Sequence, residues 1–234
     1  MSPPTHPITL SLELSQQIGS VALSNRRGKI EEIKIGTNCR EEDEVMPAIK
    51  KLALDLDIAP KSVDLIVVSI GPGGFTGLRS AVAITKMISL VSEAATVPIE
   101  TAISVAHHAN KGGGPFFIVS GVKQESFWLS KVQFKNERWA CESGVSTTAE
   151  MEKNLSGMAG VFGDSYLPES VQALCSSNNI SIYNSITTAS SLLSLGTRLY
   201  AEDNNVAVNP QELTPLYPRE PEAVRVWKTK RPTG

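Results

Sequence analysis

A glycine-rich segment, GPGGFTGLR at residues 71–79, constrains this 234-residue chain more than any other stretch. It follows an apolar run at 63–70 that predicts a buried strand, and it opens a stretch at 78–91 with apolar residues at helical spacing. The sequence therefore predicts a strand, a tight turn and a helix. Because the first N–H groups of a helix are unpaired and lie at the positive end of its dipole, such a turn can hold an anion. It can equally be a tight connection that lets another backbone approach closely.

The spacing of the glycines does not match either of two common phosphate-binding loops. No Gly-Lys-Ser/Thr follows at the distance that a Walker loop requires, and the glycines do not fall in G-x-G-x-x-G order. The turn is therefore interpreted as a packing device, and its residues are Gly71, Pro72, Gly73, Gly74, Phe75 and Gly77.

The complete segment resembles the G-P-G-S-F-T-G-x-R signature of the TsaB (YeaZ) family, with Gly74 where the family usually has serine. A second stretch, PLYPR at 215–219 with WK at 227–228, is similar to the ending of that family. The resemblance implies a non-catalytic partner of the TsaD enzyme, which adds a threonylcarbamoyl group to the adenosine next to the anticodon of tRNA. The wider complex of that family includes TsaE.

Hydrophobic periodicity by itself predicts an α/β protein. The resemblance implies two ribonuclease-H-like, actin-type ATPase lobes with mixed sheets flanked by helices. The KGGGP stretch at 111–115 marks the expected boundary. We expect an N-terminal lobe at 1–110, which carries the glycine-rich segment, and a degenerate second lobe at 111–234, which ends in a basic tail.

Catalytic chemistry is not predicted. Actin-type ATPases hold Mg²⁺ with carboxylates at the first hairpin of each lobe. By resemblance, the corresponding positions here are Glu13, within Leu-Glu-Leu, and Gly121, within Ser-Gly-Val-Lys, so the nucleotide site is degenerate. We expect no cofactor in this chain, with ATP and Mg²⁺ bound only by the partner TsaD.

A metal site and a nucleophile are not predicted either. His107 and His108 are adjacent, so on a helix they point about 100° apart and do not bind one metal together. The three cysteines, Cys39, Cys141 and Cys175, form no C-x-x-C pair, and no G-x-S-x-G elbow is present.

The resemblance implies that the surface for a partner is built from the helices near 45–56 and 76–91. Arg79 either contacts a partner or makes an internal salt bridge. A second copy of the chain would use the same surface. The candidate contacts are Thr76, Arg79, Ser80, Ala83, Lys86, Met87 and Ile49.

The formal charge of −2 argues against a protein that binds nucleic acid through bulk charge. The basic tail is either a solvated end or a tRNA contact, through Arg225, Lys228, Lys230 and Arg231. Sparse cysteines and the absence of a signal-peptide pattern or a long apolar run predict a cytoplasmic protein without a membrane span. Two alternatives stay open: a weak ATPase or kinase-like enzyme of the actin-type superfold, and a homodimeric scaffold without TsaD.

Overall fold

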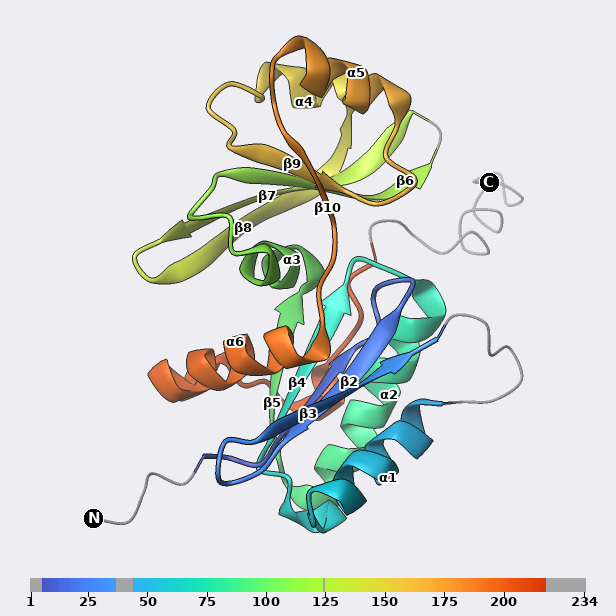
Figure 1. The fold of residues 1–234 in the computed structure, drawn as a ribbon, viewed down its shortest axis with the longest axis vertical. Coiled ribbons are helices and arrows are strands. Elements are labelled where there is room, and N and C mark those ends of the chain that lie inside the picture. The colour runs from blue at the N-terminus through green and yellow to red at the C-terminus, as the bar shows by residue number, and fades with distance from the viewer. Residues whose placement is uncertain (1–5, 37–43, 124, 218–234) are drawn as a thin grey trace, which may run out of the picture.

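The protein consists of two five-stranded mixed sheets placed one above the other along the long axis (Figure 1). This computed structural model describes residues 6–36, 44–123 and 125–217. The first sheet has the order β3-β2-β1-β4-β5, and the second has the order β10-β9-β6-β7-β8. The strands of the first sheet are β1 (Thr9–Glu13), β2 (Gly19–Ser24), β3 (Ile30–Ile35), β4 (Leu65–Gly71) and β5 (Ala95–Glu100). Those of the second are β6 (Phe116–Lys123), β7 (Ser126–Lys135), β8 (Arg138–Thr147), β9 (Gly160–Gly163) and β10 (Ile182–Asn184).

The two sheets have the same topology. In each, three strands form an antiparallel meander, and two further strands then pair in parallel with the first strand of the meander and with each other. Helices alternate with the later strands in both halves: α1 (Val45–Asp55), α2 (Phe75–Ser92), α3 (Thr101–Ala109), α4 (Thr148–Lys153), α5 (Glu169–Ser177) and α6 (Ala189–Glu202). This repetition confirms the predicted two-lobe, actin-type α/β fold. None of the helices in the described ranges is long and apolar enough to cross a membrane.

Helices cover both faces of the first sheet because β4, one of its interior strands, is apolar on both sides. Ile66 and Val68 of β4 face α1 and α2, whereas Leu65 and Val67 face α6. Parallel strands buried on both faces show this kind of continuous apolar run. The second sheet is covered by α4 and α5 on one face and by α3 on the other.

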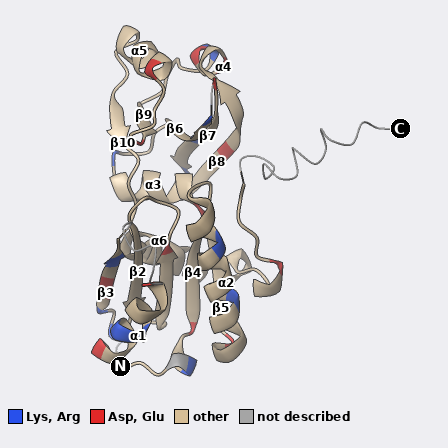
Figure 2. Ribbon diagram, turned by 90° about the vertical axis from the view of Figure 1, so that its right-hand side faces the viewer, with Lys and Arg blue, Asp and Glu red and all other residues tan. Residues whose placement is uncertain are grey.

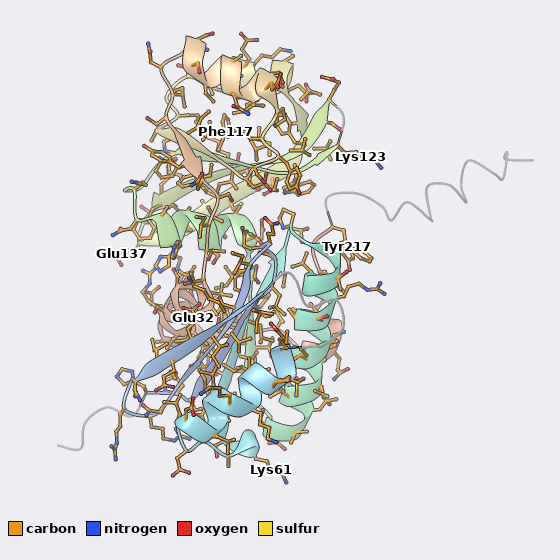
Figure 3. The ribbon with its side chains drawn as sticks, turned by 45° about the vertical axis from the view of Figure 1, so that its right-hand side comes forward. Glu32, Lys61, Phe117, Lys123, Glu137 and Tyr217 are labelled. Carbon is orange, nitrogen blue, oxygen red and sulfur yellow. The ribbon has the colours of Figure 1, made fainter. Side chains whose placement is uncertain are left out.

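The last helix of each half therefore packs against the sheet of the other half. Three alanine and valine side chains of α3 join the core of the second sheet, whereas α6 lies on the first sheet (Figure 1). The Glu32 carboxylate of β3 fixes the start of α6: it accepts hydrogen bonds from the Ala189 N–H, at 3.0 Å, and from the Ser190 hydroxyl. Figure 3 shows Glu32 on the part of the first sheet that faces α6.

The predicted second lobe at 111–234 includes α6, and this helix packs on the first sheet. The apolar stripe of α6 matches the open face of the first sheet, where Leu192 and Leu195 are fully buried. Contact is so close that a Cβ on Gly196 would lie 2.4 Å from Val67.

The chain after α6 also returns to the first lobe. It forms two 3-10 turns, at Asn204–Val206 and Pro210–Glu212. The Leu216 N–H then donates to the carbonyl of Ile70 at the end of β4, at 2.7 Å. The predicted basic tail, with Arg225, Lys228, Lys230 and Arg231, lies outside the described residues.

Candidate functional site

The glycine-rich turn packs against the turn between β1 and β2 of its own lobe. The Gly74 N–H donates to the carbonyl of Ser15, at 2.8 Å. A Cβ on Gly73 would lie 2.3 Å from the Ser15 carbonyl oxygen, and one on Gly77 would lie 2.1 Å from the Leu14 carbonyl oxygen. These two glycines therefore admit the backbone of the β1–β2 turn of the same chain, which agrees with a packing role for the glycine-rich turn. Gly74 is different, because a Cβ added there would lie 3.7 Å from the nearest atom, an ordinary van der Waals distance.

The two motifs that carry the family resemblance meet in space. Gly71 has a φ of +105°, and a Cβ there would lie 2.9 Å from the Leu216 carbonyl oxygen. The rings of Phe75 and Tyr217 lie 5.1 Å apart, between the start of α2 and the C-terminal segment. Figure 3 places Tyr217 beside the upper end of α2. The rest of the second motif, Pro218, Arg219 and the pair at 227–228, lies outside the described residues.

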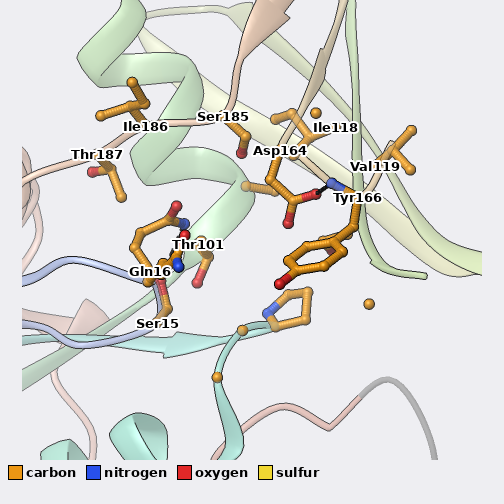
Figure 4. Close-up of a pocket in the computed structure, with 18 of the residues that line it drawn as sticks. Ser15, Gln16, Thr101, Ile118, Val119, Asp164, Tyr166, Ser185, Ile186 and Thr187 are labelled. Carbon is orange, nitrogen blue, oxygen red and sulfur yellow. Dashed lines mark hydrogen bonds between the residues drawn. The ribbon is translucent and has the colours of Figure 1, made fainter. Parts of the chain in front are cut away.

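A cleft of about 570 Å³ separates the two lobes (Figure 4). The first lobe contributes the β1–β2 turn, the glycine-rich turn at 72–74 and the start of α3 at Thr101. The second lobe contributes the end of β6, which includes the predicted Gly121, and the segments that follow β9 and β10. The cleft lies where the carboxyl ends of parallel strands meet, which is where open α/β sheets bind ligands.

Asp164 and Tyr166 are cleft residues that the sequence analysis did not single out. Asp164 follows β9, and its Oδ1 accepts a hydrogen bond from the Tyr166 N–H, at 2.8 Å. The Tyr166 side chain is 72% exposed, although it is a large aromatic group. The signal in the sequence was the Gly-Asp pair directly after a buried strand, which places a carboxylate at the ligand-binding edge of a sheet.

Glu13 does not line the cleft. It is fully buried, and its Oε1 accepts hydrogen bonds from the Ser15 N–H, at 2.9 Å, and from the Ser15 hydroxyl. Its Oε2 has no hydrogen-bond partner among the described residues. Burial raises the pKa of Glu13, and the hydrogen bonds from Ser15 oppose that shift only in part.

The residues of the cleft do not fit a magnesium-bound nucleotide. The first-lobe carboxylate, Glu13, is enclosed, and Gly121 brings no carboxylate from the second lobe. In the described part of the chain, no group of three or more His, Cys, Asp and Glu side chains is placed to hold a metal ion. No lysine or arginine lies among the described lining residues to neutralise a triphosphate.

The remaining nucleophile candidates are held in unreactive surroundings. Cys141 lies between the lobes, with its Sγ 3.4 Å from the Glu100 carboxylate, and burial raises the pKa of its thiol to about 11. Burial also raises the pKa of the Cys175 thiol in the second core. The pKa of His107 is lowered, first by burial and then by the charges of Arg198 and His108. Cys39 lies outside the described residues.

Most of the predicted partner residues lie on one exposed face of α2. Ser80 and Lys86 are half-buried at its edge, and Ile49 of α1 is half-buried against the first core. The only charged residues of α2 are Arg79 and Lys86 (Figure 2). The face itself consists of Phe75, Thr76, Arg79, Ala83, Met87, Leu90 and Val91.

Arg79 and Lys86 both make contacts within the chain. The Arg79 guanidinium lies 4.9 Å from the centre of the Phe75 ring, which is a cation–π distance. The Lys86 ammonium group donates to the Gln211 carbonyl, at 2.9 Å. Arg79 therefore contacts an aromatic ring, where the sequence analysis had considered an internal salt bridge.

The chain is similar in sequence to proteins of tRNA threonylcarbamoyladenosine biosynthesis. A family model described as TsaD, tRNA N6-adenosine threonylcarbamoyltransferase, matches residues 40–223. A protein of Bacillus subtilis (strain 168) named tRNA threonylcarbamoyladenosine biosynthesis protein TsaB is 30% identical over 94 residues, which are 39% of this chain and 40% of that protein. The TsaB protein of Buchnera aphidicola subsp. Schizaphis graminum is 34% identical over 58 residues, which are 24% of this chain and 28% of that protein. The chain thus matches less than half the length of these curated relatives.

A solved structure of YeaZ from Pseudomonas aeruginosa has the same fold. Its TM-score is 0.71 at 18% identity, and the superposition covers 90% of this chain and 99% of that one.

Proposed function

This chain belongs to the TsaD (tRNA N6-adenosine threonylcarbamoyltransferase) family, and we propose that it serves tRNA threonylcarbamoyladenosine biosynthesis as a TsaB-type subunit. In this proposal the chain binds TsaD and stabilises its active conformation, and TsaD performs the transfer to adenosine. The contribution of this chain is binding free energy, which shifts TsaD towards one state.

The exposed face of α2 is the observation that carries the proposal. Leu90 is 70% exposed, Val91 54% and Met87 48%. Contiguous exposed apolar side chains on a helix are typical of a surface that packs against another protein. A small residue in the middle of this face, Ala83, would let a partner helix approach closely, and Ser80 at its edge is small as well.

The cleft supports the non-catalytic part of the proposal. Neither position where an actin-type ATPase needs a carboxylate can bind Mg²⁺ in the cleft here. The Glu13 carboxylate is buried and accepts a hydrogen bond from Ser15, and Gly121 has no side chain. We therefore propose that ATP and Mg²⁺ are bound by TsaD only. A weak ATPase or kinase-like activity is the less favoured reading, because a Mg-nucleotide would find no pair of carboxylates in this cleft.

A homodimer would use the same α2 face, so the experiment must separate the two partners. The chain is co-expressed with TsaD of the same genome, and the product is analysed by size-exclusion chromatography with light scattering. We expect a one-to-one complex that Ala83→Arg abolishes, because a guanidinium in the middle of the face would be buried without a partner. The matched control is Ala201→Arg on α6, another exposed alanine on a helix away from this face.

A second readout connects binding to function. In a strain that lacks this gene, the wild-type chain and Ala201→Arg should restore threonylcarbamoyladenosine in tRNA hydrolysates, whereas Ala83→Arg should not. Failure of the wild-type chain to bind TsaD would refute the proposal. If the chain instead forms a homodimer that Ala83→Arg dissociates, the α2 face joins two copies of the chain without TsaD. We also propose that TsaE takes part in the complex and that the tail at 225–231 contacts tRNA. Both can be tested only in the assembled complex.

A further inference from the structure

The cleft between the lobes is lined by one carboxylate and by no cationic side chain among the described residues. Asp164 is the only charged side chain among its described lining residues, and no lysine, arginine or histidine accompanies it. Its Oδ1 accepts the Tyr166 N–H, and no hydrogen bond to Oδ2 is made within the described ranges. A carboxylate oxygen therefore faces a cavity whose volume, about 570 Å³, suits a small molecule.

We propose that this cleft binds an uncharged ring compound with neighbouring hydroxyl groups, a nucleoside or a sugar, and rejects its phosphorylated forms. Two hydroxyl groups on adjacent carbons can donate together to one carboxylate, and Asp164 supplies that acceptor. This proposal does not rest on pairing with TsaD.

Side chains around Asp164 fit the apolar face of such a ring. Tyr166 is 72% exposed, and Ile18 and Ile186 are 60% and 53% exposed at the same cleft. In Figure 4 the Tyr166 ring lies beside Asp164, on the side of the cleft opposite Ile186 and Thr187. An aromatic ring next to a carboxylate gives a planar or sugar ring both a stacking surface and a polar anchor.

Polar groups of the first lobe complete the site. Figure 4 shows the Gln16 side chain and Thr101 across the cleft from Asp164 and Tyr166. The Gln16 amide can donate and accept at the same time, which suits hydroxyl groups and ring nitrogens. A ligand in this position would contact both lobes.

Phosphate is disfavoured by two features. A dianion near Asp164 would be repelled, with no cation among the described lining residues to offset the repulsion. The glycine-rich turn also offers a phosphate one donor fewer, because the Gly74 N–H already donates to the Ser15 carbonyl. Each added negative charge should therefore weaken binding.

The test measures binding of adenosine, AMP, Mg-ATP, methyl glucoside and glucose 6-phosphate to the full chain by titration calorimetry and by saturation-transfer NMR. We expect adenosine or methyl glucoside to bind at millimolar or better affinity, and which of them binds identifies the ligand as a nucleoside or a sugar. AMP should bind at least tenfold more weakly than adenosine if the nucleoside is the ligand, and glucose 6-phosphate at least tenfold more weakly than methyl glucoside if it is the sugar.

Two variants locate the binding. Asp164→Asn keeps the shape of the side chain and should weaken binding about tenfold while reducing the discrimination against phosphate; Tyr166→Ala should weaken binding to a similar degree. Asp57→Asn is the matched control, since it removes an exposed carboxylate that does not line the cleft. The inference is overturned if neither uncharged compound binds up to about 10 mM, a free energy below about 3 kcal/mol. It is also overturned if Mg-ATP binds as tightly as adenosine, or if neither cleft variant changes the affinity.

Discussion

Replacement of Gly77 by alanine is expected to destabilise the folded chain by about 2–3 kcal/mol. The added Cβ would lie 2.1 Å from the Leu14 carbonyl oxygen, a separation that real Cβ atoms do not show. The obstacle is backbone, so relief requires α2 and the β1–β2 turn to move apart by about 1 Å. Overpacking of this kind costs about 1–3 kcal/mol.

Two further terms act on the same variant. Separation of the two turns would stretch the hydrogen bond from the Gly74 N–H to the Ser15 carbonyl, which contributes about 1 kcal/mol. In the opposite direction, alanine is favoured over glycine within a helix by up to about 1 kcal/mol. The two terms nearly cancel, so the steric cost decides the sign.

The measurement is urea denaturation followed by circular dichroism, with thermal unfolding in parallel. For a chain of this length, 2–3 kcal/mol corresponds to a fall in Tm of about 4–12 °C. Gly74→Ser is the matched control in the same turn, because its Cβ would have 3.7 Å of free space. It should change stability by less than about 0.5 kcal/mol. If Gly77→Ala were as stable as Gly74→Ser, the account of the turn as an internal packing device would be refuted.

Three further predictions concern the buried carboxylate of Glu13 and the half-buried side chains of Glu32 and Cys141. Burial raises the pKa of Glu13 above its ordinary value of 4.5. The free-energy cost of the buried, ionised carboxylate is therefore absent below pH 4.5 and grows as the pH rises towards the folded pKa. Glu13→Gln should be more stable than the wild type near neutral pH, and thermal unfolding measured against pH should show this difference vanish in acid. Glu32→Ala removes the acceptor at the start of α6 and should lower the free energy of unfolding by about 1–2 kcal/mol in urea denaturation. Glu31→Ala, on the same strand, removes only a surface ion pair and should lower it by less than about 0.5 kcal/mol. Because the thiol pKa of Cys141 is about 11 instead of 9.0, iodoacetamide at pH 8 should label it about 100-fold more slowly in the folded chain than in guanidinium, as peptide mapping would quantify; equal rates in both states would contradict that value.

Local patterns in the sequence were sufficient for the order of the elements. The apolar run at 63–70 predicts β4, and the helical spacing of apolar residues at 78–91 predicts α2. The start of β5 is not evident from local sequence, because Ala95 and Thr96 show no apolar alternation by themselves. Their place in the sheet comes from pairing with β4, which no local window contains.

The cleft and the exchange of helices were harder to predict, for one shared reason. Both depend on which surfaces meet after the chain has folded. The face of α6 has the same periodicity whether it packs on its own sheet or on the other one, so its sequence does not choose between them. Asp164 and Tyr166 gain importance only because the ends of β6 and β9 meet the glycine-rich turn across the cleft.

The crossed positions of α3 and α6 govern the order in which the chain can become stable during synthesis. One face of the first sheet remains largely open to water until α6 has left the ribosome, because Leu65 and Val67 pack in one cluster with residues 192–195. A nascent chain ending at residue 110 would thus expose this face together with the unpaired apolar side of α3. The two lobes can complete their cores only together and late, since such long-range contacts form slowly. A gene fragment that encodes one lobe should consequently yield an aggregating product, and fusions that separate the lobes should fail for the same reason.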